Sequence, residues 1–143
     1  MKHRAFEKGY VLKLESGEDI LDVISEFLKK NGVKSTVIFG IGAVSEARIG
    51  FFDGTEYRVT ELNENLEVLS LLGNVSLKEE EPLPHLHITL ADSEGRAFGG
   101  HLFKGCIVSA TLEVFILELP ILLERDFDEG IGLWLLKVGL DEG

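Results

Sequence analysis

The chain has 143 residues, of which 45% are hydrophobic and 27% are charged, so we expect one folded domain over residues 1–143 and exclude a disordered protein. The formal net charge of -11 argues against DNA as a partner, because duplex affinity comes largely from cations that release condensed counterions. The single cysteine, Cys106, excludes a disulfide framework. The chain starts without an apolar leader and lacks an apolar run of about 20 residues, so we expect a cytoplasmic protein with no membrane segment.

The first third of the chain predicts a strand followed by a helix. Residues 5–14 alternate in polarity, which is typical of a strand. Ser16 is the predicted N-cap of the helix, and apolar residues then recur at helical spacing as far as Leu28. The run 29–32, Lys-Lys-Asn-Gly, predicts its end, with cations at the negative pole and a left-handed cap.

The rest of the chain predicts strands and turns. A glycine loop at 40–43 is predicted between two strands, and Asp53-Gly54 predicts a hairpin turn. Residues 78–82 predict an acidic loop, and residues 126–130 predict a loop before a final strand at 131–140. The predicted strands are 35–39, 47–52, 57–62, 66–72, 75–77, 86–90, 97–103 and 106–119. The expected fold class is therefore α+β, mostly antiparallel sheet in two layers with one N-terminal helix.

The apolar content exceeds what one helix on one sheet face would use. Residues 106–119 are nearly continuous apolar sequence, which indicates a strand covered on both faces. With one predicted helix, we expect the second cover to come from another copy of the chain.

The densest chemical signal is a set of three histidines. His85 and His87 are two residues apart in a predicted strand, so they share a face of the sheet. The run 92–96, Asp-Ser-Glu-Gly-Arg, fits a three-residue hairpin loop with Gly95 left-handed, and that loop sets His87 opposite His101. Three imidazoles on one face, with a fourth position open, are typical of a catalytic zinc site, so the sequence predicts Zn²⁺ or another divalent transition metal. The alternative is two structural histidines on a sheet face.

Two charged residues are candidates for supporting this site. Glu113 lies in a strongly apolar strand, where a carboxylate needs a partner. A two-residue turn at Lys104-Gly105 would set Arg96 across from Glu113. The pair is either a structural ion pair or a functional one that orients the metal ligands or serves as an acid or base.

The residues also resemble a known family. The runs 86–88, 92–95 and 99–102 resemble the signature of the plants and prokaryotes conserved (PPC) domain, and runs 16–20, 40–44, 67–74 and 110–114 match it in order. The resemblance implies an α+β fold that assembles as a homotrimer and a metal held by His85, His87 and His101. Plant members carry an AT-hook that binds DNA, but this chain has no Arg-Gly-Arg-Pro segment. We therefore do not expect the DNA-binding role to apply.

A second resemblance concerns chemistry. The HxH and GGH runs are similar to those of α-acetolactate decarboxylase, a zinc enzyme with three histidine ligands, where the metal would act as a Lewis acid. Two hypotheses follow. The first is a non-enzymatic trimeric module whose metal is structural, sensory or partner-facing. The second is a metal-dependent lyase or hydrolase acting on a small oxygenated substrate. The sequence leaves the substrate or partner unnamed.

Overall fold

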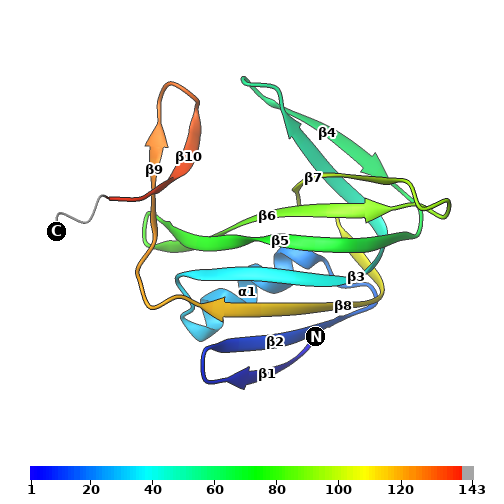
Figure 1. The fold of residues 1–143 in the computed structure, drawn as a ribbon, viewed down its shortest axis with the longest axis horizontal. Helices are drawn as coiled ribbons and strands as arrows, with labels where there is room; N and C mark the ends of the chain where they lie inside the picture. Colours follow the sequence, from blue (N-terminus) through cyan, green and yellow to red (C-terminus); the bar gives the residue numbers. More distant parts are fainter. Residues whose placement is uncertain (140–143) are drawn as a thin grey trace.

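The computed structural model describes residues 1–139, and these form one mixed β-sheet with one helix (Figure 1). All strand pairings are antiparallel except one parallel bridge between Leu77 and Glu124. The predicted combination of one helix with a mostly antiparallel sheet is therefore confirmed. The strands are β1 (Lys2–Phe6), β2 (Gly9–Glu15), β3 (Thr36–Phe52), β4 (Tyr57–Leu62), β5 (Leu66–Lys78), β6 (Glu81–Ala91), β7 (Ala97–Leu102), β8 (Ile107–Glu118), β9 (Glu124–Asp128) and β10 (Leu133–Lys137).

The helix α1 (Ile20–Asn31) ends as predicted but begins differently. Gly32 caps it in a left-handed conformation, with φ of 65°. The N-cap is Asp19 rather than Ser16: its side chain accepts a hydrogen bond from the Asp22 backbone N–H at 3.0 Å and another from the Gly105 N–H at 2.7 Å. A carboxylate at this position satisfies helix N–H groups and also ties the helix to the turn before β8.

The predicted first strand, 5–14, is wrong in one respect, because the segment is a hairpin. β1 and β2 pair antiparallel, with Ala5 opposite Tyr10, and a tight turn at Glu7-Lys8 joins them. Both halves alternate in polarity, so periodicity alone did not reveal the turn.

The predicted glycine loop at 40–43 is also wrong, because β3 runs unbroken through it. Gly40 and Gly42 lie where β8 approaches closely: a Cβ on Gly40 would come 2.6 Å from the Glu113 carbonyl oxygen, and one on Gly42 would come 2.1 Å from the Thr111 carbonyl oxygen. These glycines therefore permit strand contact rather than a turn. β5 likewise runs through Gly73-Asn74, joining the two strands predicted at 66–72 and 75–77.

The second half of the sheet carries further differences. The predicted acidic loop shrinks to a turn at Glu79 and Glu80, both with positive φ, and residues 81–82 belong to β6. The predicted loop at 126–130 lies partly in β9, which forms a hairpin with β10. The predicted last strand, 131–140, is shorter, and residue 140 lies outside the described residues.

The sheet curls around the core. β3 pairs with β5 and β8 along its first half and with β4 and β7 near its end, while β5, β6 and β7 pair in sequence. Strands β3, β5, β6 and β7 therefore close on themselves. The helix packs its apolar face on the inner side of the sheet, behind β3 and β8 in Figure 1. The buried residues of the helix are Ile20, Ile24, Phe27 and Leu28.

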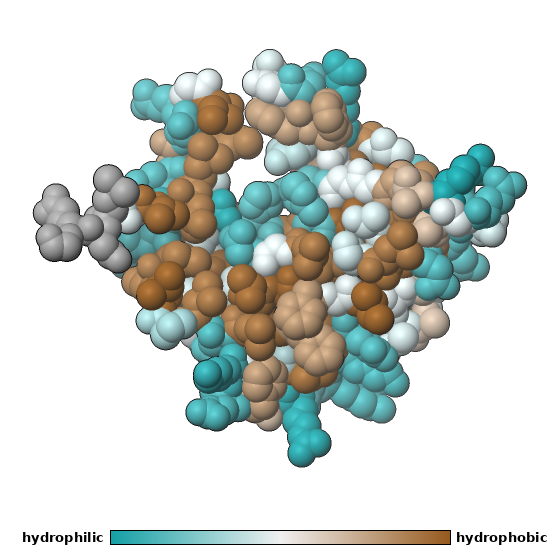
Figure 2. Space-filling view, viewed as in Figure 1, coloured by the Kyte–Doolittle hydropathy of each residue, from teal (hydrophilic) through white to brown (hydrophobic). Residues whose placement is uncertain are grey.

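The outer face of the sheet, opposite the helix, is open in the single chain. β8 alternates buried and exposed residues, so the prediction that both of its faces are covered is not met within one chain. Apolar side chains instead gather on the outer face over β3, β8 and β5 (Figure 2). We call this set the outer patch; its members are Val37, Phe39, Ile41, Leu69, Leu72 and Phe115.

Candidate metal centre

The hairpin of β6 and β7 has the register that its turn residues predict. The Asp92 N–H donates to the Arg96 carbonyl, the Asp92 carboxylate accepts from Glu94 and Arg96 N–H groups, and Gly95 has φ of 77°. Ala91 then pairs with Ala97, and His87 with His101. Directly opposed residues of an antiparallel pair share a face, so the turn chemistry brings His101 to the side of the sheet that carries His87.

The three histidines meet on the outer face of the sheet. Ring centroids lie 5.1 Å apart for His85 and His87, 5.5 Å for His85 and His101, and 5.7 Å for His87 and His101. One ring nitrogen from each lies within 4.8 Å of the others. A tetrahedral zinc with Zn–N bonds of 2.0–2.1 Å separates its ligands by about 3.3 Å, so a small rotation of the rings closes the site.

The surroundings favour neutral imidazoles, which are the form that binds metals. Burial, with the nearby His85 and His87, lowers the pKa of His101 to about 4. Burial also lowers the pKa of His85, with smaller contributions from the charges of Arg125 and His87. His101 Nδ1 is buried and has no hydrogen-bond partner among the described residues. An unpaired buried ring nitrogen is costly unless a cation or a donor satisfies it, so the residues present fit a metal ion.

Two aromatic rings cover one side of the cluster. The ring centroid of His101 lies 4.9 Å from that of Tyr57, at the start of β4, and 4.8 Å from that of Phe103, just after β7. On the other side, Arg125 of β9 donates to Asn74 of β5, which lies directly opposite His85. Figure 2 shows a hydrophilic hollow between the β9–β10 hairpin and the β3–β4 hairpin, above the β5 and β6 strands.

Sequence reasoning missed these four neighbours. Tyr57 and Phe103 are ordinary strand residues by pattern, and Asn74 lies between the strands predicted at 66–72 and 75–77. Arg125 stands in a mixed charged and apolar run with no motif. Their roles depend on pairing between distant strands, for which this sequence carries no local signal.

The predicted pairing of Arg96 with Glu113 is wrong. β8 pairs with β2 and β3 rather than with β7, so Glu113 lies opposite Lys13 and Ile41 and is exposed. Arg96 forms ion pairs with Asp92 at 2.9 Å and Glu94 at 3.1 Å, at the tip of the hairpin. After the Lys104-Gly105 turn the chain continues along β3, pairing with residues 36–46 of that strand, instead of folding back on β7.

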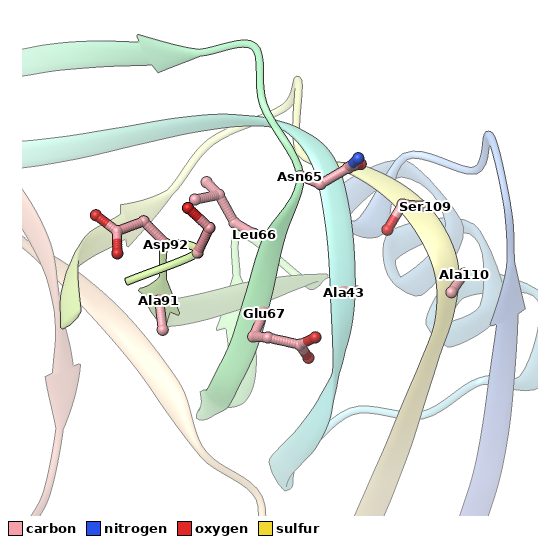
Figure 3. A pocket seen from close by; sticks show the side chains of 9 residues that line it. Ala43, Asn65, Leu66, Glu67, Ala91, Asp92, Ser109 and Ala110 are labelled. Carbon is pink, nitrogen blue, oxygen red and sulfur yellow. The ribbon is translucent and has the colours of Figure 1, made fainter. Parts of the chain in front are cut away.

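A second hollow lies on another part of the sheet, near the β6–β7 turn (Figure 3). It is an open pocket of about 490 Å³ whose polar side chains include Asn65, Glu67, Asp92 and Ser109. None of the three histidines lines it. Among the described residues, the group of metal-ligating side chains that converges is the histidine cluster.

The fold and the three facing histidines together define a small β-rich domain with a candidate metal centre. The chain belongs to the Plants and Prokaryotes Conserved domain family, whose model matches residues 1–120. The PPC resemblance noted from the sequence is thereby confirmed. Among residues 1–139, no helix is both long and apolar enough to cross a membrane.

Solved structures share the fold over nearly the whole chain. A protein from Archaeoglobus fulgidus described as metal-containing is 43% identical, with a TM-score of 0.82 over 96% of this chain and 100% of that one. A protein from Bacteroides thetaiotaomicron, named as a candidate DNA-binding protein, is 27% identical, with a TM-score of 0.91 over 95% of this chain and 96% of that one.

Two further comparisons cover a smaller share of the related protein. The bifunctional protein GlmU of a Synechococcus strain is 32% identical over 110 residues, which are 76% of this chain and 17% of that protein. The chain thus spans about a sixth of the curated relatives that it matches. A Staphylococcus aureus protein similar to α-acetolactate decarboxylase is 17% identical, with a TM-score of 0.52 over 80% of this chain and 54% of that one, which shows likeness of fold alone.

Proposed function

We propose that the chain is a metal-binding PPC-domain protein in which His85, His87 and His101 hold one divalent transition ion, with Zn²⁺ as the expected metal. The observation that carries the proposal is the convergence of three ring nitrogens within 4.8 Å on one face of the sheet. Three histidine ligands leave a fourth position for water or an external ligand. A bound Zn²⁺ would supply Lewis-acid chemistry at that position.

The side chains around the cluster define what the protein itself contributes. The close Tyr57 and Phe103 rings limit how far the His101 ring can turn, and burial keeps it neutral at physiological pH. No carboxylate of residues 1–139 joins the three histidines as a metal-ligating group. This environment favours a sensory, structural or partner-facing metal over a lyase or hydrolase, which would need a general acid or base beside the ion.

Metal analysis of purified protein tests the proposal. We expect about one zinc per chain in the wild type and strong loss in His87→Ala, because two nitrogens hold the ion far less well than three. His3→Ala is the matched control, since His3 lies on β1 beside Phe27 and away from the cluster. Equal zinc content in the wild type and His87→Ala would refute the proposal.

We also propose that the chain assembles as a homotrimer through the outer patch. Phe39 and Phe115 stack at 5.3 Å with rings 7° apart, yet both remain more than a third exposed. A contiguous apolar surface of this kind is typical of an interface between copies. The number three comes from the family resemblance.

Light scattering tests the assembly. We expect about 47 kDa, three times the chain mass of 15.8 kDa, at micromolar concentration. Phe39→Asp should shift the protein toward the monomer, because a carboxylate would be buried at the interface without a partner. Val59→Asp, an exposed apolar position on β4 outside the patch, is the control. A wild-type monomer would refute this proposal.

A further inference from the structure

Arg125 is a buried cation with no carboxylate partner among residues 1–139. Its side chain is 6% exposed. Nη1 donates to the Trp134 carbonyl at 3.1 Å and Nη2 donates to the Asn74 amide oxygen at 2.8 Å. Nε is buried and has no partner among residues 1–139, and no carboxylate of those residues forms an ion pair with Arg125.

This arrangement is unusual for a guanidinium. Arginine carries five N–H donors, and a buried charge is normally paired with a carboxylate or phosphate. Here two neutral oxygens hold the group in place and leave Nε–H unused, although burial already opposes the charge and lowers the pKa of Arg125. The guanidinium is therefore held in place by neutral groups, and its charge lacks only a paired anion.

The guanidinium lies next to the histidine cluster. Its partner Asn74 is directly opposite His85 across the β5–β6 ladder, and opposed side chains point to the same face. Asn74 and the Trp134 carbonyl thus position Arg125 beside the side chains proposed to bind the ion.

We propose that Arg125 and the histidine cluster form a two-point site for a small carboxylate anion. One carboxylate oxygen occupies the open position on the ion, and the other accepts the Nε–H of Arg125. A hydrogen bond between a guanidinium N–H and a carboxylate oxygen is charge-assisted, which makes it stronger than a neutral one. The inference rests on the proposed metal site and adds the chemical class of its exchangeable ligand.

The first experiment uses cobalt-loaded protein, because the visible absorption of Co²⁺ responds to a change of ligand. Acetate is titrated at constant ionic strength into the wild type and into Arg125→Gln. We expect the variant to bind cobalt at the same stoichiometry and acetate at least about tenfold more weakly, because it loses a charge-assisted hydrogen bond. Arg96→Gln is the control: Arg96 is exposed at the hairpin tip and should leave acetate affinity unchanged.

A second measurement needs no variant. In the ¹⁵N–¹H spectrum of the zinc-loaded wild type, the buried Arg125 Nε–H signal should shift on addition of acetate and should follow the same binding curve. This readout keeps the proposal testable if Arg125→Gln fails to fold. Arg125→Lys, which keeps the charge but lacks Nε–H, should give intermediate affinity.

The outcomes separate the two proposals. If the wild type binds no metal, both the metal site and the two-point site are wrong. Only the two-point site is wrong if metal loading is normal but acetate binds equally well to the wild type and to Arg125→Gln. The same holds if acetate does not shift the Arg125 Nε–H signal. If inorganic phosphate shows the Arg125 dependence and acetate does not, the carboxylate assignment is overturned.

Discussion

Gly73→Ala probes how closely β5 and β6 must approach to hold the histidine cluster. A Cβ on Gly73 would lie 1.9 Å from the carbonyl oxygen of His85 and 2.9 Å from the Cα of Leu86. Ordinary contact between such atoms is about 3.4 Å or more, so the two strands must part locally by more than about 1 Å. Both obstacles are backbone atoms, which no side-chain rotation can relieve.

Two consequences follow from this displacement. Overpacking of this kind lowers the free energy of unfolding by about 1–3 kcal/mol. The shift also moves His85 relative to His87 and His101, and metal–nitrogen bonds tolerate only about 0.2 Å of error. We therefore expect the zinc dissociation constant to rise about 10- to 100-fold, the range seen when support for a ligand is lost.

Gly9→Ala is the matched control. Its Cβ would lie 1.8 Å from the Ile116 carbonyl oxygen, between β2 and β8, in a part of the sheet that carries none of the three histidines. Urea unfolding of the metal-free proteins should show similar loss of stability in both variants, whereas zinc competition against a chelator should show weaker binding only in Gly73→Ala. Equal zinc affinity in the two variants would refute the reasoning.

Two further predictions concern pH and DNA. In metal-free protein, the free energy of unfolding should fall as the pH drops from about 6.5 to about 4, because the unfolded chain protonates His101 over this window while the folded chain does not. His101→Asn should reduce that dependence in urea titrations, and an unchanged dependence would contradict the assignment. Labelled AT-rich duplex at about 150 mM salt should show no saturable binding at sub-micromolar protein, because of the -11 charge; saturable binding there would contradict the charge argument.

The β6–β7 hairpin was predictable because its signals are local. Asp92 and Gly95 have defined places in a three-residue loop, and the loop length alone fixes that His87 faces His101. The helix end was predictable for the same reason, since two lysines in the last turn and the left-handed cap Gly32 lie within four residues. Turn and cap chemistry acts over a few residues, so it can be read from a sequence without knowing what packs nearby.

The rest depends on contacts between distant segments. Gly40 and Gly42 predicted a loop because glycine favours turns. In the structure they instead leave room for the backbone of β8, about 70 residues later in the chain. The bond from Arg125 to Asn74 likewise joins residues 51 positions apart. A sequence pattern records the residue type at such positions and leaves open which strand lies beside it.

The two halves of the proposed ligand site come from separate stretches of the chain. The histidines belong to a continuous hairpin inside the family match at residues 1–120, whereas Arg125 belongs to β9, beyond the end of that match. Changes in the last hairpin could therefore alter which anion is selected while the ion-holding strands stay intact. Grafting different C-terminal hairpins onto one unchanged scaffold is a practical route to variants of altered ligand preference.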